Sequence, residues 1–430
     1  MKARPPTAII GRLDAFRDLF TAPQFYHFVV FVWGVMLSAT GATLTKLNAS
    51  VGSDRHVGSL ARFLSESPWS VEVLTERLLR LVIRASGHAG DRLVIALDDT
   101  DAPHPWAKKI FGMSRHFDVD ASHVNGMVVT RLGHCWLTMS LLVKTPAGRQ
   151  WLGFCFRAWL YIRQRDCPAG DPEKGVLAWA YRDKLALAVE AMRDFCWPPG
   201  MRRLVVADAF FAKAEMANQD FDLLSRLIAS NIFFGFPPPP TGKRGRPRKY
   251  GLKRSLKEWA AQATFSPCAI TRYGRDENAM IAEVVGLREG WKRPAKIIAI
   301  REENGHITFL VTTDLTLSAA EMVEFYAARF QIELGYRELK TDLGLADALV
   351  RSRPAVDRYV HLMMVGQAML MLAAIDLQQE LGLPLAPSLG EVKTMFQRQQ
   401  TAARIFALLA QFGIPVENSA VLRRVRIATG

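Results

Sequence analysis

The sequence predicts a mixed α/β fold, and three observations support this. Two short apolar runs, Arg92–Asp98 and Arg203–Asp208, each end in an aspartate, which is typical of central strands buried on both faces. Further strand-like runs and a long helical segment lie between them. Much later, Ser318 to Glu321 has the pattern of a capping box that begins a helix. We therefore expect a sheet with helices on its faces.

Residues 1–88 have helical periodicity and no strand signals. In the segments that begin at Ser59 and Ser70, apolar residues recur three and four positions apart, and each serine can cap a helix. We expect a helical N-terminal domain over 1–88 and interpret it as a DNA-binding domain. A plain packing module is the alternative.

The chain from Arg92 to Phe236 alternates between strand and helix patterns. The other expected strands are Val124–Arg131, Cys135–Val143, Gln150–Trp159 and Asn231–Phe236, with a turn at Leu132–His134. The expected helices are Lys174–Trp197 and Lys213–Ala229. Strands that can form a meander, followed by helix, strand, helix and strand, give the order of a ribonuclease-H-like sheet. We assign this domain to 89–236 and 318–350, where the closing helix falls.

Residues 237–317 separate the closing helix from the rest of that domain. They open on a proline-rich, basic segment that cannot form regular structure. Strand-like runs follow around Ala279–Gly286, Ala295–Ile300 and Ile307–Thr313. We expect a basic loop and a β-rich insertion over 237–317, and a C-terminal helical region over 351–430.

Composition restricts the class of function. The 55 Lys and Arg residues against 41 Asp and Glu give a net charge of +14, which indicates a polyanionic partner. Five cysteines without a CxxC pair argue against a disulfide framework and against a thiolate zinc site. Four histidines likewise lack metal-ligand spacing: His104, His116, His123 and His134.

No secretory signal is evident at the N-terminus. The two most apolar stretches, Phe28–Ala39 and Leu362–Ile375, are shorter than the roughly 20 residues that a membrane-spanning helix needs. We interpret both as buried helices of a cytoplasmic protein with no membrane partner.

The helix that begins at Ser318 presents one carboxylate on a polar stripe. The stripe consists of Tyr326, Arg329, Glu333 and Lys340. At about 100° per residue these four fall within an arc of roughly 60°, whereas Glu338 projects about 140° away from Glu333. An apolar stripe beside it would seat the helix on the sheet. Glu333 is therefore the carboxylate that this face presents.

Two aspartates at strand ends and this glutamate can converge at one edge of the sheet. Three close carboxylates repel each other unless a cation lies among them. Ligation by oxygen alone favours Mg²⁺ or Mn²⁺ over zinc. Two such ions about 3.5–4 Å apart support phosphodiester cleavage.

Three motifs together resemble the DDE transposases of bacterial insertion sequences whose signature is written YREK. They are Asp98-Asp99-Thr100, Val205-Val206-Ala207-Asp208 and Tyr326-x2-Arg329-x3-Glu333-x6-Lys340. The resemblance covers about residues 90–345, and its four-residue signature is the specific part. It implies that Asp98, Asp208 and Glu333 are catalytic metal ligands for two Mg²⁺ ions, which Mn²⁺ can replace.

The same resemblance implies that Tyr326, Arg329 and Lys340 contact DNA phosphates. Alternation along the strand leaves Asp98 and Asp99 open as the first ligand, and the family's Asp-x-Thr spacing favours Asp98. Hairpin formation in part of this class uses a flipped base stacked on an aromatic residue of the insertion. Trp291 and Trp259 lie in the right region for this role, although a core or surface tryptophan is the alternative.

The region from Lys243 to Lys257 holds eight basic residues and no acidic one. They are Lys243, Arg244, Arg246, Arg248, Lys249, Lys253, Arg254 and Lys257. Gly245-Arg246-Pro247 resembles the core of an AT-hook, which fits a narrow minor groove. We interpret the loop as a DNA contact, with a solvated linker as the alternative.

The sequence thus predicts a DNA transposase that cleaves transposon ends and joins 3′-hydroxyls to target DNA. Its partners would be double-stranded DNA and a second copy of the chain, and its location the bacterial nucleoid. A catalytically retired DNA-binding regulator and a stand-alone Mg²⁺-dependent endonuclease are the alternatives.

Overall fold

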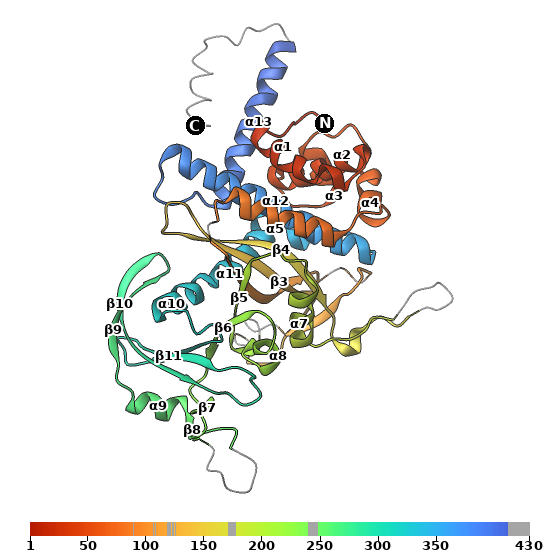
Figure 1. Cartoon of the computed structure of the whole chain (residues 1–430). Coiled ribbons are helices and arrows are strands. Elements are labelled where there is room, and N and C mark those ends of the chain that lie inside the picture. The colour runs from red at the N-terminus through yellow and green to blue at the C-terminus, as the bar shows by residue number, and fades with distance from the viewer. Residues whose placement is uncertain are drawn as a thin grey trace.

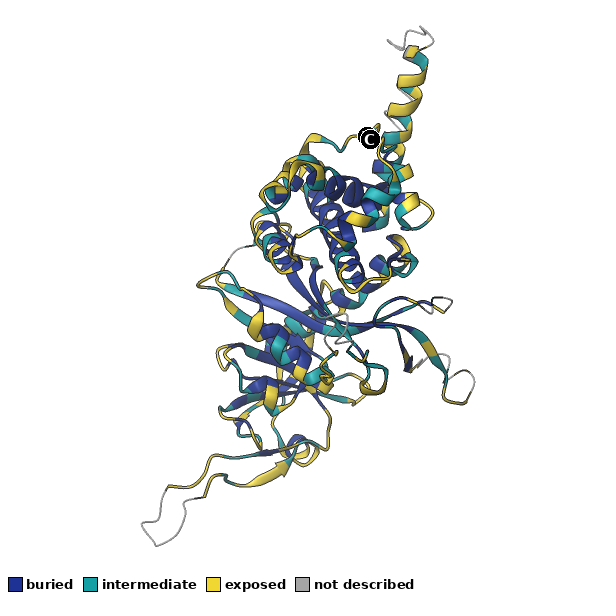
Figure 2. Cartoon of the chain, turned by 90° about the vertical axis from the view of Figure 1, so that its right-hand side faces the viewer, coloured by how far each residue is buried: buried dark blue, intermediate teal, exposed yellow. Residues whose placement is uncertain are grey.

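The computed structural model describes residues 1–411 except 89, 106, 108, 118–121, 123, 125, 171–177 and 240–247. Figure 1 shows a helical layer at one end, a large sheet across the middle and a β-rich region at the other end. Buried residues fill the helical layer and line the sheet, as Figure 2 shows. The mixed α/β class predicted from the sequence is confirmed.

Helices from both ends of the chain form the helical layer. The N-terminal ones are α1 (Thr7–Leu13), a 3₁₀ helix (Asp14–Leu19), α2 (Ala22–Leu37), α3 (Leu44–Ser50), α4 (Val57–Ser65) and α5 (Val71–Ala85). The C-terminal ones are α12 (Arg353–Leu381) and α13 (Leu389–Gln411). Because α2 packs against α12 and α13, the expected N-terminal and C-terminal helical regions share one core.

Both apolar stretches lie in buried helices, as predicted. Almost all of α2 is buried. Among the described residues, α12 is long and apolar enough to cross a membrane, but 89% of its apolar window is buried inside the molecule. Packing within this protein therefore accounts for its apolar character.

The central sheet has the expected ribonuclease-H-like order. Strands β1 (Arg92–Pro103), β3 (Thr130–Lys144) and β4 (Trp151–Tyr161) form the antiparallel meander. Strand β5 (Arg202–Ala207) pairs parallel with β1, and β6 (Asp222–Leu227) pairs parallel with β5. A short strand, β2 (Ser114–Phe117), pairs with the start of β3.

Several predicted boundaries in this region are wrong. The residues of the predicted turn, 132–134, lie inside β3 instead. Within β3, Gly133 pairs both with Pro103 at the end of β1 and with Ser114 at the start of β2. The predicted helix 213–229 is reduced to α8 (Ala214–Ala217), and Asp222–Leu227 of the same stretch form β6. A short apolar run can form a helix or a strand, and in this segment pairing with β5 produces a strand. The predicted helix 174–197 is α7 (Lys184–Asp194), and 174–177 lie outside the described residues.

The predicted insertion extends the same sheet. It contains β8 (Lys253–Ser255), α9 (Leu256–Gln262), β9 (Ser266–Arg272), β10 (Arg275–Gly286), β11 (Ala295–Arg301) and β12 (Ile307–Thr312), and β7 (Ile232–Phe234) lies just before it. Strands β9 to β12 join the central sheet because β12 pairs antiparallel with β6, which gives a ten-stranded sheet. The predicted core strand 231–236 is instead β7, which pairs with β8 in a separate two-stranded sheet.

Each face of β1 packs in a different hydrophobic cluster. Leu93, Ile95 and Leu97 belong to the larger cluster, which also includes the helical layer. Val94 and Ala96 belong to a second cluster with residues of α10 (Ala319–Ala328) and α11 (Phe330–Arg337). We call the second side the α11 face and the other side the α7 face, since α7 packs there against β3 and β4.

Candidate active site

The pairing of β1 with β5 places Asp98, inside β1, and Asp208, just after β5, on the same face. Leu97 pairs with Ala207 in the parallel register, so both aspartates directly follow the paired ends of neighbouring strands. Side chains alternate along a strand. Asp98 therefore continues the row of Val94 and Ala96 onto the α11 face, and Asp99 projects to the α7 face. Strand pairing thus separates two aspartates that sequence alternation left open.

Helix α11 brings Glu333 to this strand end. The Arg329 guanidinium donates from Nη1 to Asp98 Oδ2 at 3.0 Å and from Nη2 to Glu333 Oε1 at 2.8 Å. The Arg329 and Asp98 side chains are 16% and 19% exposed, whereas Glu333 is 41% exposed. One guanidinium therefore joins two of the three expected metal ligands.

The helical segment that carries Glu333 starts at Ser318 as predicted but is less regular than one continuous α-helix. Ser318 and Glu321 form the expected capping box. The regular hydrogen bonding is interrupted at Arg329, whose N–H is shared between two carbonyls, and the segment widens into a π-helical turn at Glu338–Asp342. It ends before Gly344, whose φ of +79° suits glycine. π-Helical turns are frequent at functional sites.

Glu338 points away from the site, as the helical spacing predicts. Its carboxylate accepts a hydrogen bond from Gln367 of α12 at 3.0 Å. Burial raises the pKa of Glu338, with the Gln367 hydrogen bond acting against this effect. Glu333 therefore accepts a hydrogen bond from Arg329 at the site, whereas Glu338 accepts one from Gln367 of α12.

The two aspartates are in an environment that disfavours their charge. Burial raises the pKa of Asp98 from 3.8 to about 6, the Arg329 charge opposes this, and the nearby Asp208 and Asp99 charges add to it. The pKa of Asp208 is also raised by burial, against the hydrogen bond that its Oδ1 accepts from the Phe210 N–H at 3.0 Å. A bound cation would relieve both carboxylates.

The donor set fits a hard divalent cation, since all three side chains offer only carboxylate oxygens. Among the described residues, however, the three ligand atoms that lie within 4.8 Å of one another belong to a different group, discussed below. Arg329 occupies the space between Asp98 and Glu333. Arg329 binds one oxygen of each carboxylate, so Asp98 Oδ1 and Glu333 Oε2 are the oxygens that it leaves for a metal ion.

The other two residues of the polar stripe also lie near Asp98. Lys340 donates to Thr100 Oγ1 at 3.0 Å and to the Asp101 carbonyl at 3.4 Å. The Tyr326 ring centroid lies 5.8 Å from the Arg329 guanidinium carbon. The Arg329 Nε is buried and has no hydrogen-bond partner among the described residues. The stripe therefore gathers cationic and hydroxyl donors around a carboxylate pair.

Comparison with known proteins gives the family. A family model described as DDE superfamily endonuclease matches residues 15–279, which include Asp98 and Asp208. The chain belongs to the DDE superfamily endonucleases. A second model, described as transposase DDE domain, matches residues 195–366, which include Asp208 and Glu333. The protein is therefore a DNA transposase in the general sense of this superfamily.

Two further comparisons add less. A search of curated proteins finds no match. Among solved structures, the chain is similar to a piggyBac transposase synaptic complex with hairpin DNA, with 11% identity and a TM-score of 0.36. That similarity covers 96% of this chain and 77% of the other.

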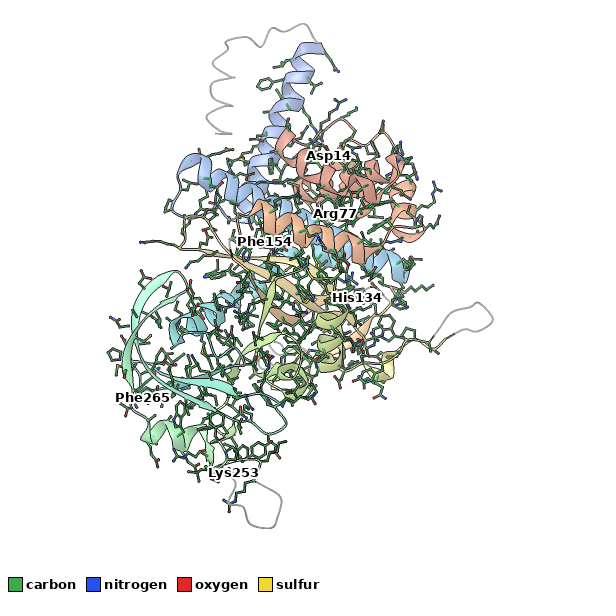
Figure 3. All side chains as sticks on the ribbon, in the orientation of Figure 1. Asp14, Arg77, His134, Phe154, Lys253 and Phe265 are labelled. Atoms are coloured by element: carbon green, nitrogen blue, oxygen red, sulfur yellow. The ribbon has the colours of Figure 1, made fainter. Side chains whose placement is uncertain are left out.

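The predicted basic loop of this DDE endonuclease is only partly described. Lys243, Arg244 and Arg246 lie outside the described residues. Arg248 is exposed, and the Lys249 Nζ lies 5.3 Å from the Tyr250 ring centroid. Figure 3 places Lys253 at the tip of the molecule, well away from His134 on β3. The described end of the loop thus lies far from the strand ends.

The two tryptophans considered for base stacking are both buried. Trp291 is 6% exposed and lies under the Arg288 guanidinium, with 4.8 Å between the guanidinium carbon and the ring centroid. Trp259 is 7% exposed. Neither ring offers a free face to a flipped base in this conformation, so the Trp291 prediction does not fit the structure.

An aromatic residue that the sequence analysis missed is exposed near the polar stripe. Tyr273, at the turn between β9 and β10, is 70% exposed and has a φ of +52°. Its ring centroid lies 6.3 Å from that of Phe330, and it lines a surface pocket together with Tyr326 and Arg226. The Tyr273-Gly274 pair between two strand-like runs was the available turn signal.

Proposed function

We propose that this protein is a transposase of the bacterial insertion-sequence type with a YREK signature. It would cleave transposon ends and join the freed 3′-hydroxyls to target DNA. The observation that carries the proposal is the convergence of Asp98, Asp208 and the Arg329–Glu333 pair on one face of the sheet. These side chains come from two adjacent parallel strands and from a helix more than a hundred residues further along the chain.

In this proposal Asp98, Asp208 and Glu333 hold two Mg²⁺ ions, for which Mn²⁺ can substitute. When bound, such ions stabilise the attacking and leaving oxygens of phosphodiester cleavage. The carboxylates position the ions, and the raised pKa values of the two aspartates fit groups that need a cation to ionise fully at neutral pH. Arg329 keeps Asp98 and Glu333 paired until metal and DNA arrive.

Arg329 and Lys340 then bind phosphates beside the scissile bond. A guanidinium is suited to this role because it offers five donors in a planar fork. In Arg329, the Nε–H has no hydrogen-bond partner among the described residues. Tyr326 supports the guanidinium through its ring and offers a hydroxyl. Because Arg329 contacts Asp98 and Lys340 contacts Thr100, a phosphate bound by these two cations would lie next to the metal ligands.

The remaining DNA contacts in the proposal follow from charge. The basic loop, including Lys243, Arg244, Arg246, Arg248 and Lys249, would grip the DNA backbone or minor groove. The helices of residues 1–88 would bind the transposon end. Handling two ends together requires a homodimer on DNA, which we place at the bacterial nucleoid.

The test is an end-cleavage assay with the full chain, Mg²⁺ and labelled DNA that carries the element's own ends. We expect cleavage and strand transfer by the wild type, and loss of both in Asp208→Asn and Glu333→Gln with DNA binding retained. Glu338→Gln is the matched control because this residue is on the same helical segment but faces Gln367. It should remain active.

Each alternative function predicts a different outcome. DNA binding without cleavage by the wild type would support a retired regulator. Cleavage without strand transfer would support a stand-alone endonuclease. Full activity in Glu333→Gln would show that this residue is not a catalytic ligand.

A further inference from the structure

The α7 face of β1 carries a second group of potential metal ligands. Asp99 and Asp101 project to this face, and Asp101 is directly opposite Cys135 in the β1–β3 pairing. His116 on β2 pairs with Arg131 and so shares its side of the sheet with Cys135, four residues further along β3. Three adjacent strands thus contribute a carboxylate, an imidazole and a thiol to one spot.

The ligand atoms of Asp101, His116 and Cys135 all lie within 4.8 Å of one another. The His116 Nδ1 is 3.8 Å from Asp101 Oδ1. That oxygen is buried and has no hydrogen-bond partner among the described residues. A buried carboxylate oxygen without a partner is costly unless some positive group meets it.

The histidine is already oriented for ligation. Its Nε2 lies 2.8 Å from Ser114 Oγ, so a proton on Nε2 leaves Nδ1 free as the lone-pair donor. Burial lowers the pKa of His116, with Asp101 opposing this effect, which favours the neutral imidazole that metals bind. Metal ligands commonly have such an outer hydrogen bond that fixes the ring.

Lys184 of α7 shows that this pocket attracts positive charge. Its ammonium donates to Asp99 Oδ2 at 2.6 Å, and the same carboxylate oxygen lies 3.6 Å from Cys135 Sγ. The ammonium neutralises Asp99, whereas Asp101 Oδ1 has no hydrogen-bond partner among the residues that the structure describes. Lys184 thus hydrogen-bonds Asp99, and its charge acts on Asp101 only from a longer distance.

We propose that Asp101, His116 and Cys135 form a zinc-binding site on the face of the sheet opposite the catalytic acids. A thiolate and an imidazole select a borderline-soft ion over Mg²⁺. The Cys135 thiol loses its proton to solvent when the ion binds. A water molecule fills the fourth position. The ion fixes the edge strand β2 to β1 and β3, three residues beyond Asp98.

Cobalt(II) alone is the probe, because a thiolate ligand gives it a sulfur-to-metal charge-transfer band. It is titrated into chelator-treated full-length protein in the presence of excess Mg²⁺, which occupies oxygen-only sites. We expect the band to saturate at one ion per chain and to disappear when Zn²⁺ is added. Zn²⁺ should also raise the melting temperature.

The variants identify the ligands. Cys135→Ser should abolish the band, and His116→Asn or Asp101→Asn should weaken cobalt binding by roughly tenfold or more. Cys155→Ser is the matched control, since Cys155 is equally buried but faces Ser140. Far-UV circular dichroism checks that each variant is folded. If Cys135→Ser does not fold, the wild-type titration and His116→Asn decide the question alone.

The proposal is overturned if the wild type shows no charge-transfer band, or if folded Cys135→Ser keeps it. Its failure is distinguishable from failure of the transposase assignment. Glu333→Gln should lose DNA cleavage and keep the cobalt band, because Glu333 lies on the α11 face with Arg329.

Discussion

The two faces of β1 carry similar acidic side chains in very different surroundings. On the α11 face, Asp98 accepts a hydrogen bond from Arg329, and Thr100 accepts one from Lys340. On the α7 face, Asp99 meets Lys184, and Asp101 lies beside a histidine and a cysteine. Residue type alone therefore does not define a site. The face to which each side chain projects determines which ligands join it, and hence which cation suits it.

On each face, a basic side chain neutralises acids that a metal ion could neutralise instead. Arg329 bridges Asp98 and Glu333, and Lys184 pairs with Asp99. The two side chains differ in how many acids they can bind. A guanidinium can bind two carboxylates at once, whereas an ammonium is a point charge. Removing a metal should therefore be better tolerated on the α11 face, where Arg329 compensates two acids.

The largest expected effect is a difference in DNA cleavage between variants of two neighbouring residues, Asp98 and Asp99. Asp98→Asn should lower the rate of end cleavage in Mg²⁺ by on the order of 10³-fold or more, at least about 4 kcal/mol, because it removes a ligand of the proposed metal site. Asp99→Asn should stay within about tenfold of the wild type. Single-turnover cleavage of labelled ends measures both. Equal losses would show that the two faces do not act separately.

Arg329→Gln tests how the α11 face is held together without metal. It breaks two hydrogen bonds to Asp98 and Glu333 and leaves a mostly buried carboxylate unpaired, which should cost about 4 kcal/mol of stability in chelator. Mg²⁺ should restore part of this, so the Mg²⁺-induced rise in melting temperature should exceed that of the wild type.

Arg272→Gln is the control for that experiment. Arg272 also makes two hydrogen bonds to one acid, Glu302, but on β9 in the insertion. Its loss should not depend on Mg²⁺. A Mg²⁺ response in Arg329→Gln no larger than in Arg272→Gln would contradict the idea that Arg329 takes the place of the metal.

The pH dependence of metal-free protein gives a smaller effect with a definite sign. The folded-state pKa of Asp98 is raised from 3.8 to about 6, so folding favours its protonated form. The resulting stability is fully present below 3.8 and is lost as the pH rises through about 6, which amounts to at most about 3 kcal/mol. Asp208 acts in the same direction.

Melting temperatures in chelator from about pH 4 to about pH 8 test this prediction. Over that range the stability of the wild type relative to Asp98→Asn should fall by up to about 3 kcal/mol, because only the wild type has the buried carboxyl to ionise. Parallel profiles for the two proteins would rule out Asp98 as the titrating group.

Local signals in the sequence were sufficient for much of the α11 face. The apolar runs before Asp98 and Asp208 fit central strands, and the capping box at Ser318 fixed the start of the helix that carries Glu333. These features depend on neighbours a few residues away, so periodicity and spacing detect them. The ribonuclease-H-like order followed from them.

Features that depend on pairing could not be read in this way. The segment that forms β6 is apolar enough for a helix, and only its place between β5 and β12 makes it a strand. The faces to which Asp98 and Asp99 project followed only from the register of β1. The group of Asp101, His116 and Cys135 comes from three strands with no ligand-like spacing, so the sequence indicated no thiolate site there.

Lys184→Met gives the smallest expected effect and tests the independence of the two faces directly. The Lys184–Asp99 pair is partly exposed, at 29% and 27%, so its loss should cost no more than about 1 kcal/mol of stability. Cobalt should bind several-fold more tightly, because a positive charge next to Cys135 has been removed. End cleavage should change by less than about twofold, since Lys184 contacts Asp99 and not Asp98. A loss of cleavage as large as that of Asp98→Asn would mean that the α7 face sets the position of β1 for catalysis, and the two faces would then be one functional unit.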